Sequence, residues 1–330
     1  MLISHPSSVK LSLPVVTYLG PPSSYTHQAA LQCLDFDSYE FQPSTSISDI
    51  FESVQSGAAE LGVIPIENST NGPVILSFEL LADRENLYPN VNICKETYLK
   101  VSHYLLGRQS PPQINDSPVM SGVCTPSTAT PLPSMPRSAP LCSIKHIKCL
   151  YSHPQVWGQC EVFLTTYFKG IDRIDTSSTS MAAHLVCQDR TGTSAAIASK
   201  LASKLNNLDI LAEEIEDDQD NTTRFLVLCK DKFVKSGFSG KTRTMISFEV
   251  QHENGALASV LDCFAKSSLN LTSINSRPTK AKPFQYIFFL EFQGSLYNDP
   301  EKKVKNTLEA LQEYVRCWRF LGSWDDQLNS

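Results

Sequence analysis

Four short clusters of polar residues could carry out chemistry in this chain. They are Ser24-Tyr25-Thr26-His27, Glu67-Asn68-Ser69-Thr70, the run SHPQVWGQ from Ser152 to Gln159, and Asn221-Thr222-Thr223-Arg224-Phe225. All four lie at the ends of predicted buried strands, where α/β proteins place their ligands. Because hydroxyls and amides outnumber charges in them, we expect a cleft that binds a small polar anion with the help of helix N-termini. Taken singly, each cluster is also compatible with an ordinary turn.

The common signatures of cofactor and nucleophile chemistry are absent from the sequence. It contains no GxGxxG, GxxxxGK[ST], GxSxG or HExxH motif. None of its seven histidines is spaced to form a metal pair with a nearby cysteine or carboxylate. The sequence therefore predicts an active site that needs neither a metal nor a cofactor.

The composition argues against several classes of protein. Lys and Arg number 28 against 34 Asp and Glu, for a net charge of −6, which does not favour nucleic-acid binding. No apolar run approaches the roughly 20 residues that span a bilayer, and the start MLISHPSSVK does not read as a signal peptide. Ten cysteines without any CxxC spacing indicate reduced thiols. We expect a cytoplasmic protein that binds neither nucleic acid nor membrane.

Strand and helix patterns alternate along the N-terminal part of the chain. We expect strands at Val15–Leu19 and Leu61–Ile66, a helix over Tyr25–Leu34, and a helix over Ile47–Val54 that Ser46 caps. Strands separated by helices favour a parallel α/β sheet.

The segment 108–143 interrupts this alternation. Eight of the chain's 20 prolines fall between Pro111 and Pro140, mixed with Ser and Thr. Such a composition buries too little surface to offset the entropy lost on ordering, so it predicts a disordered surface insertion. Its role is open, because it could carry phosphorylation or partner sites or be a tolerated lengthening without a role.

After the insertion, the α/β alternation resumes with an expected strand at 144–150 and a helix at 155–168. The segments Ile171–Asp175, Met181–Cys187, Ser194–Ile197 and Leu208–Ala212 continue it, and Phe225–Cys229 closes it. A linker over Asp231–Thr242 follows. Residues 245–321 then give the order β-α-β-β-α-β, which is typical of a ferredoxin-like domain.

Five motifs in this order resemble the prephenate dehydratase family of phenylalanine biosynthesis. They are LGPPSSYTH at 19–27, GVIPIENSTNG at 62–72, YSHPQVWGQC at 151–160, SSTSMAA at 177–183 and NTTRFLVL at 221–228. The tail over 243–322, with ENGALASVL and INSRP, resembles the regulatory ACT domain found behind that catalytic domain.

The resemblance implies a fold and a division into domains. Residues 1–232 would form a two-lobed α/β catalytic domain like a type-2 periplasmic binding protein, and 243–330 an α+β ferredoxin-like ACT domain. The chain would cross between the lobes near Ile93–Leu106 and return by Phe225–Cys229. Thr223 and Arg224 would then face the cleft at the crossing.

The reaction implied is conversion of prephenate to phenylpyruvate, carbon dioxide and water, without a cofactor. Arogenate, the aminated relative of prephenate, is an alternative substrate that the sequence does not decide. A catalytically silent amino-acid sensor with the same cleft is a second alternative. The resemblance also implies feedback inhibition by phenylalanine and a homodimer or higher homo-oligomer.

The motif match assigns roles to individual residues. Thr223 would be a positioned donor to the leaving hydroxyl, Asn68 and Gln159 amide donors, and Ser152 a carboxylate ligand. Glu67 is either catalytic or structural, because an ionised carboxylate would repel a dianion. The residues expected to bind substrate are Ser24, Tyr25, Thr26, Ser178, Thr179, Arg224 and Phe225.

Alternative roles remain for three of the side chains. Arg224 could instead pair inside the fold, and His27 and His153 could be catalytic or serve as caps or core residues. Ser177 stands where the family often has a Glu, which weakens any claim that this position needs an acid.

The effector site would combine a helix start with a strand end. Its residues are Asn254, Gly255, Ala256 and Leu257, together with Asn275, Ser276, Arg277 and Pro278. Asn254 and Asn275 depart from the Pro and Glu that are usual there, so the same residues could form only a tight turn. The site would lie between two paired chains.

Overall fold

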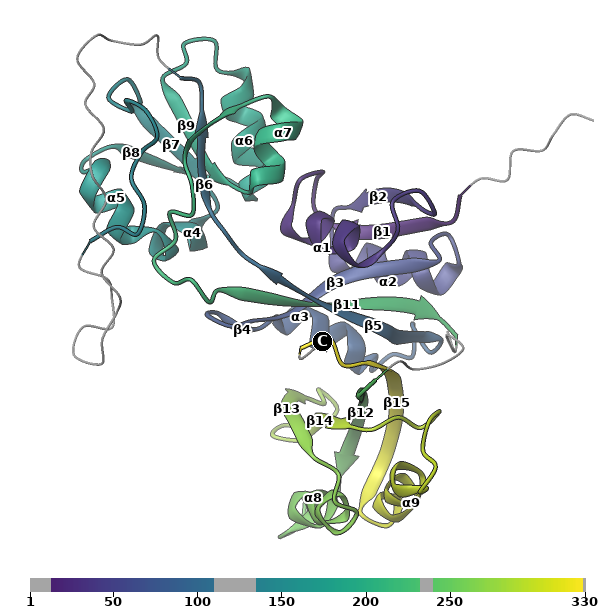
Figure 1. Cartoon of the computed structure of the whole chain (residues 1–330). Coiled ribbons are helices and arrows are strands. Elements are labelled where there is room, and N and C mark those ends of the chain that lie inside the picture. The colour runs from purple at the N-terminus through teal and green to yellow at the C-terminus, as the bar shows by residue number, and fades with distance from the viewer. Residues whose placement is uncertain (1–12, 110–134, 232–239, 329–330) are drawn as a thin grey trace, which may run out of the picture.

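The computed structural model describes residues 13–109, 135–231 and 240–328. In Figure 1 these residues form two α/β lobes joined by long strands, and a C-terminal domain packs beneath one lobe. This is the two-lobed α/β fold with a ferredoxin-like C-terminal domain that the sequence predicts.

The first lobe is built on a six-stranded sheet in the order β2-β1-β3-β11-β5, with the short β4 paired to β3. Helix α2 begins where expected, because Ser46 and Asp49 form a reciprocal capping box. The elements of this lobe are β1 (Val15–Leu19), α1 (Tyr25–Cys33), β2 (Glu40–Ser44), α2 (Ile47–Ser56), β3 (Leu61–Asn68), β4 (Gly72–Pro73), α3 (Ile75–Ala82), β5 (Val91–Lys100) and β11 (Thr222–Lys230).

The second lobe is built on a five-stranded sheet in the order β10-β6-β9-β7-β8. Leu105, Leu150 and Ile197 form the centre of its core, and all three side chains are fully buried. Its elements are β6 (Tyr104–Gly107), β7 (Cys149–Ser152), α4 (Pro154–Gln159), α5 (Glu161–Tyr167), β8 (Asp172–Asp175), α6 (Thr179–Gln188), β9 (Ser194–Ala198), α7 (Lys200–Asn206) and β10 (Asp209–Ala212).

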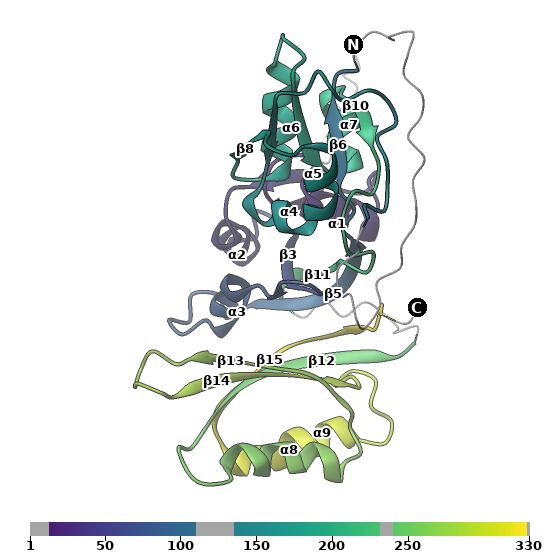
Figure 2. The same cartoon turned by 90° about the vertical axis from the view of Figure 1, so that its left-hand side faces the viewer.

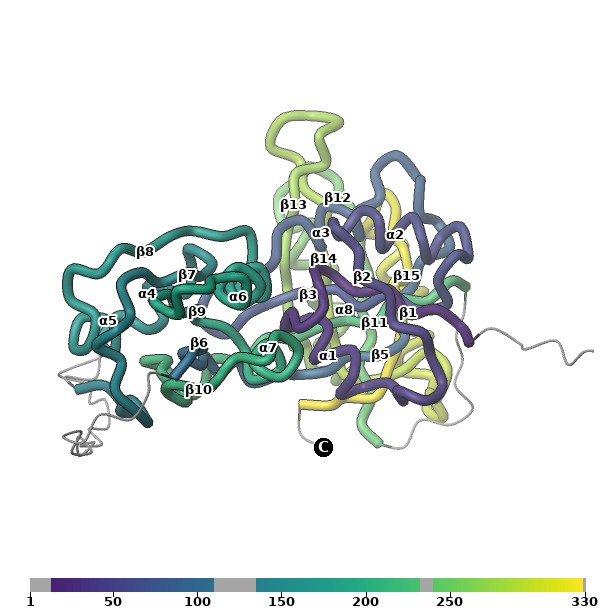
Figure 3. Tube along the Cα trace, turned by 90° about the horizontal axis from the view of Figure 1, so that it is seen from above, coloured from purple at the N-terminus to yellow at the C-terminus, as the bar shows by residue number. Residues whose placement is uncertain are grey.

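Two segments cross between the lobes, as predicted. The chain leaves the first lobe through β5, and it returns after β10 into β11, which pairs antiparallel with both β3 and β5. Seen from above, the two lobes lie side by side with these strands leading from one to the other (Figure 3). The predicted parallel sheet is therefore only partly confirmed. Strand β1 is parallel to β2 and β3, but β11 is antiparallel to β5 because it brings the chain back into the lobe that β5 leaves.

The C-terminal domain has the predicted order of strands and helices. Its four-stranded sheet has the order β13-β14-β12-β15, and its helices cover one face while the other face lies against the first lobe (Figure 2). Met245, Phe289 and Trp324 of this domain are buried in one core with Phe78 of α3 and Ile93 of β5. The elements are β12 (Thr242–Val250), α8 (Ala256–Lys266), β13 (Leu271–Pro278), β14 (Tyr286–Gln293), α9 (Lys303–Ala310), the short 3-10 helix η1 (Leu311–Glu313) and β15 (Val315–Asp325).

Several elements differ from the sequence-based prediction. Strands β2 and β4 and helix α3 were not predicted. The helix expected over Gln155–Phe168 is divided into α4 and α5 at Cys160, because the backbone of Cys160 leaves the helical region at φ −125°, ψ 22°. The strand expected at Ile144–Leu150 begins only at Cys149, because 144–147 forms a turn closed by a hydrogen bond from Ile147 N to Ile144 O.

The prediction of a disordered insertion over 108–143 is wrong for its last part. Residues 135–143 are described, Leu141 N donates to Leu211 O at 2.8 Å, and Cys142 packs against the core of the second lobe. The rest of the insertion, 110–134, and most of the linker, 232–239, lie outside the described residues. Among the helices of the described segments, none is long and apolar enough to cross a membrane.

Candidate active site

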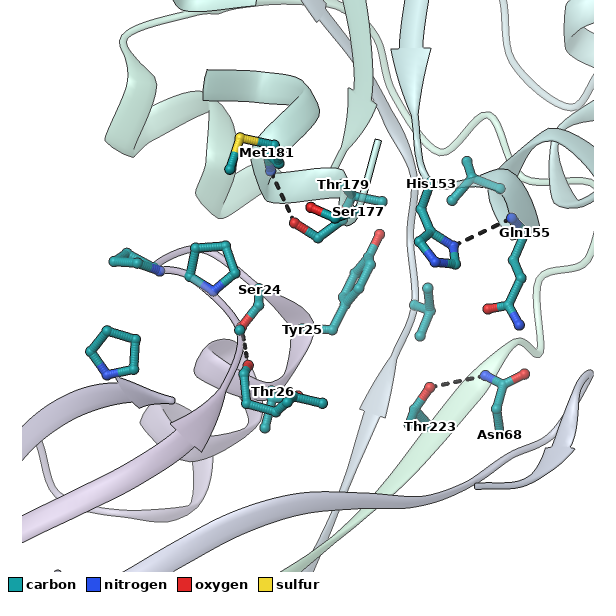
Figure 4. Close-up of a pocket in the computed structure, with 18 of the residues that line it drawn as sticks. Ser24, Tyr25, Thr26, Asn68, His153, Gln155, Ser177, Thr179, Met181 and Thr223 are labelled. Atoms are coloured by element: carbon teal, nitrogen blue, oxygen red, sulfur yellow. Dashed lines mark hydrogen bonds between the residues drawn. The ribbon is translucent and has the colours of Figure 1, made fainter. Parts of the chain in front are cut away.

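A cavity of about 760 Å³ lies between the two lobes, and both contribute to its wall. The lining includes α1 and the ends of β3 and β11 from the first lobe, and α4 and the start of α6 from the second (Figure 4). Among the described residues that line it there is no Lys, Arg, Asp or Glu. Binding of an anion would therefore depend on hydroxyls, amides and backbone N–H groups, as the sequence predicts.

Thr223 and Asn68 meet at the base of the cavity, where β11 pairs with β3. Figure 4 shows the two side chains pointing toward one another, and Asn68 Nδ2 donates to Thr223 Oγ1 at 2.9 Å. Asn68 Nδ2 also donates to Asn221 Oδ1 at 2.7 Å, and its Oδ1 accepts from the backbone of Asn71 at 2.9 Å. Because the Thr223 oxygen already accepts a hydrogen bond, its own proton is free to be donated into the cavity.

The two amide hydrogens of Asn68 are thus used inside the protein. The motif match predicts that Asn68 donates to substrate oxygens, whereas in this geometry it donates to Thr223. Both residues line the cavity, so the sequence correctly placed them together.

Gln159 reaches the cavity from the end of α4 and is held there by His103. His103 Nε2 lies 2.7 Å from Gln159 Oε1, and the Nδ1 atom of the same ring lies 2.9 Å from the hydroxyl oxygen of Tyr25. Burial lowers the pKa of His103 to about 4, so the ring is neutral at pH 7. With Nε2 carrying the proton, Gln159 accepts through Oε1, which leaves its amide hydrogens as donors for the cavity that the residue lines.

His103 was not identified from the sequence. It lies on the predicted crossing between the lobes, it lines the cavity, and only 1% of its surface is exposed. Its ring joins Tyr25 of the first lobe to Gln159 of the second. A polar residue at the crossing, directly before the apolar run of β6, was the one signal that could have singled it out.

Two helices from opposite lobes begin at the cavity wall. Ser24 caps α1 by accepting from His27 N at 3.1 Å, and Ser178 caps α6 by accepting from Met181 N at 3.1 Å. Tyr25 and Thr26, in the first turn of α1, also line the cavity, as does Thr179 at the start of α6. The positive end of each helix dipole therefore faces the cavity, where it favours an anion.

The remaining cavity residues include both expected and unexpected ones. His153 lines the cavity, but its Nδ1 accepts from Gln155 N at 3.3 Å and caps α4, which favours the capping role. His27 stacks on Tyr18 with ring centroids 4.4 Å apart and is absent from the lining, which favours the core role. Ser177 does line the cavity, to which it brings a hydroxyl and no charge.

Ser152 and Glu67 were expected to act in the cleft, and neither lines it. Ser152 is fully buried and its hydroxyl donates to Ile197 O at 2.8 Å, which ties β7 to β9. Glu67 precedes Asn68 on β3, and successive residues of a strand point to opposite faces. Since Asn68 faces the cavity, the structural reading of Glu67 is favoured.

Arg224 and Phe225 were predicted to bind substrate, and the structure contradicts both assignments. The Arg224 guanidinium is buried on the side of the sheet that faces the C-terminal domain, where its Nε donates to Glu96 Oε2 and its Nη2 to Glu291 Oε2, each at 2.8 Å. Phe225 is 1% exposed in a core with Val16 and Tyr18. Successive side chains of β11 point to opposite faces of the sheet, so Arg224 points away from the cavity because Thr223 faces it.

The expected effector residues fall into two groups in the single chain. Asn254, Gly255, Ala256 and Leu257 line a second cavity of about 540 Å³ at the start of α8, with Gly255 in left-handed backbone at φ +83°. Asn275, Ser276, Arg277 and Pro278 on β13 do not line it, and Arg277 and Pro278 instead contact Glu79 and Arg84 of the first lobe. Both groups lie at the same end of the sheet, since Ile287 of β14 pairs with Glu249 and with Arg277.

Comparison with known proteins agrees with this architecture. A model of the prephenate dehydratase family matches residues 16–233. The chain is 31% identical over 314 residues to a bifunctional chorismate mutase/prephenate dehydratase of Aquifex aeolicus, covering 95% of this chain and 74% of that protein. It is 30% identical over 344 residues to a probable prephenate dehydratase of Saccharomyces cerevisiae, covering 94% and 95%.

A solved structure extends the likeness to the whole fold. The prephenate dehydratase from Arthrobacter aurescens, in complex with L-Phe, matches with a TM-score of 0.76 at 25% identity and covers 94% of this chain and 90% of that one. The sequence motifs, the two-lobed fold and these matches together show that the chain belongs to the prephenate dehydratase family.

Proposed function

We propose that this chain converts prephenate to phenylpyruvate in the cavity between its lobes. The electron pair of the bond to the ring carboxylate enters the ring, carbon dioxide leaves, and the ring hydroxyl departs with its bonding pair and takes up a proton to become water. The gain of an aromatic ring drives the reaction. The protein has to hold a dianion, keep it desolvated and assist departure of the hydroxyl.

The Thr223–Asn68 pair is the observation that carries this proposal. A threonine hydroxyl is a weak acid, so Thr223 acts as an oriented hydrogen-bond donor to the leaving oxygen and not as the proton source. Asn68 fixes its direction by donating to Oγ1 at 2.9 Å. Such a preorganised donor is typically worth about 10²–10³ in rate.

The two carboxylates of prephenate fit the two helix N-termini at the cavity wall. One would sit at the start of α1, near Ser24, Tyr25 and Thr26, and the other at the start of α6, near Ser178 and Thr179. Gln159, oriented by His103, would donate to a substrate oxygen between them. This arrangement holds a dianion without an arginine or lysine in the described lining.

Kinetic comparison of prephenate with arogenate tests the proposal and settles the substrate. The two differ only in a keto group or an ammonium group on the side chain. We expect a higher kcat/KM for prephenate, because the described lining offers no carboxylate to pair with an ammonium. A clear preference for arogenate would reassign the substrate, and binding without turnover of either would favour the amino-acid sensor.

We further propose that residues 1–232 form the catalytic domain and that 243–330 form an ACT domain that binds phenylalanine at the start of α8. A buried ion-pair network connects this domain with the cleft. Glu291 of β14 accepts from Arg224 at 2.8 Å and from Arg243 at 3.0 Å, and Arg224 is the residue next to Thr223. A movement of the C-terminal sheet would therefore be transmitted to β11.

The oligomer and the location of the enzyme are also proposals. We propose a homodimer in which the paired C-terminal domains bring Asn275, Ser276, Arg277 and Pro278 of one chain toward the α8 cavity of the other. Reduced thiols among the described residues, such as those of Cys33 and Cys160, support a reducing compartment such as the cytoplasm.

A further inference from the structure

The end of the proline-rich insertion packs against a segment that contacts two cavity residues, His103 and Gln159. Arg137, in the described part of the insertion, lies over Glu216, which belongs to the segment that returns from β10 to β11. The side chain of Arg137 is only 12% exposed and that of Glu216 1%. Arginine is mostly exposed in proteins unless it is paired, so this burial shows that the end of the insertion is part of the packed lobe.

Arg137 contacts Glu216 at two points. Its Nη1 atom lies 3.3 Å from the Glu216 backbone oxygen, to which it donates, and 3.8 Å from the carboxylate Oε1. That Oε1 atom accepts no hydrogen bond from the residues that the structure describes. Arg137 therefore supplies charge compensation to this carboxylate oxygen while it holds the backbone of the segment in place.

The segment 215–217 in turn holds both His103 and Gln159. Glu216 Oε2 accepts from His103 N at 2.8 Å, and Ile215 N donates to His103 O at 2.9 Å. Asp217 N donates to Gln159 O at 2.7 Å. Since His103 also sets the direction of the Gln159 amide, the position of this segment determines where that amide points.

We propose that Arg137 is a positioning residue, which acts through Glu216 and His103 to hold Gln159 in its working orientation. The proposal assumes the dehydratase reaction assigned above, but it concerns an arginine of the insertion that does not line the cavity.

The electrostatics of Glu216 make the role of Arg137 measurable. Burial raises the pKa of the Glu216 carboxyl, while the hydrogen bond from His103 and the charge of Arg137 oppose that shift. Other titratable groups that act on Glu216 or are acted on by it are Tyr25, Tyr104, Cys160 and Glu214. Asp217, whose pKa burial raises to about 6, also responds to Arg137.

Loss of Arg137 should therefore impair turnover increasingly as the pH rises. Without the guanidinium the pKa of the Glu216 carboxyl rises further, and the charged form, which a higher pH favours, is buried without compensation. A neutral Glu216 can stay in place, whereas a charged one draws in water and shifts His103.

The test measures kcat and KM for prephenate from pH 6 to 8.5 in Arg137→Ala, Arg137→Lys and the wild type. For Arg137→Ala we expect kcat to fall about 10-fold at pH 8.5 and by a smaller factor at the low end of the range, with KM little changed. Arg137→Lys, which keeps the charge, should stay within 3-fold of the wild type. Arg173→Ala, which removes a surface pair with Glu161 at 2.9 Å in the same lobe, is the matched control and should have no effect.

A Glu216→Gln background separates positioning from simple loss of structure. The glutamine of this variant can still accept from His103 N but carries no charge. Adding Arg137→Ala there still removes the hydrogen bond to the backbone oxygen of residue 216, so kcat should fall, but by a smaller factor than in the wild-type background and with a weaker dependence on pH. Arg137 acts on Asp217 in both backgrounds, so the difference in the Arg137→Ala effect between the two backgrounds reports the charge of Glu216. If Arg137→Ala alone does not fold, this pair of variants still decides the question.

Replacement of the insertion gives an independent check. A Gly/Ser linker in place of 112–134 keeps Arg137 and should preserve kcat, whereas one in place of 112–140 removes it and should reproduce the pH-dependent loss. Equal kcat profiles for Arg137→Ala and the wild type, or a pH-independent loss that Glu216→Gln does not relieve, would overturn the proposal. An inactive wild type would instead refute the dehydratase assignment.

Discussion

Substitution of Asn68 by leucine tests whether this amide orients Thr223 or binds substrate. Leucine has a similar volume but no hydrogen-bond donor, so the Thr223 hydroxyl keeps its proton and loses the bond of 2.9 Å that directs it. Complete loss of the donor, in Thr223→Val, should lower kcat by about 10²–10³, equivalent to about 2.7–4 kcal/mol. Asn68→Leu removes only the orientation, so we expect part of this loss, about 10–10²-fold in kcat.

The double variant identifies which role is correct. If Asn68 acts through Thr223, adding Asn68→Leu to Thr223→Val should lower kcat by less than about 3-fold, because residues that act as a unit are not additive. KM should change little, since both amide hydrogens of Asn68 are used inside the protein. The assay is phenylpyruvate absorbance at several prephenate concentrations. Multiplicative losses, or a large rise in KM in Asn68→Leu, would refute this reasoning and return Asn68 to the substrate.

Three further predictions concern regulation, pH and stability. Glu291→Gln should raise the phenylalanine concentration that halves activity at least 5-fold, because it removes the negative charge that pairs with Arg224. An unchanged concentration would contradict transmission of the effector signal through this ion pair. The free energy of unfolding should fall by up to about 3 kcal/mol as the pH drops from 6.5 to about 4. Over this range His103 takes up a proton in the unfolded chain, whereas the buried ring of the folded chain stays neutral. Denaturant melts of His103→Gln should show a weaker dependence of the unfolding free energy on pH. A chain ending at Lys232 should melt at least 10 °C lower than the full chain, because Phe78 and Ile93 lose the core that they share with the C-terminal sheet. An equal melting temperature would disprove a shared core.

The sequence predicted the regular elements and the cleft better than the orientation of single side chains. Ser46 predicted the start of α2, and Ser24 and Ser178 were placed correctly at the cavity. Arg224 and Phe225 were assigned to the substrate because they follow Thr223 in a motif. The alternation of a strand puts Arg224 on the other face, where Glu96 and Glu291 pair with it.

Residues whose partners are distant along the chain could not be assigned from local patterns. His103 meets Gln159 across 56 positions and Tyr25 across 78, and no spacing rule connects them. Arg137 lies in a stretch whose composition predicts disorder, yet its partner Glu216 is 79 positions away. Only the packing of the second lobe, and of the two lobes against each other, brings these groups together.

The most direct test of the central claim is the stoichiometry of the reaction catalysed by the purified protein. The wild type should convert prephenate to one equivalent each of phenylpyruvate and carbon dioxide at neutral pH, and Thr223→Val, purified and folded identically, should do so at least about 10²-fold more slowly. A folded wild type that leaves prephenate unchanged, or a Thr223→Val variant as fast as the wild type, would contradict this account.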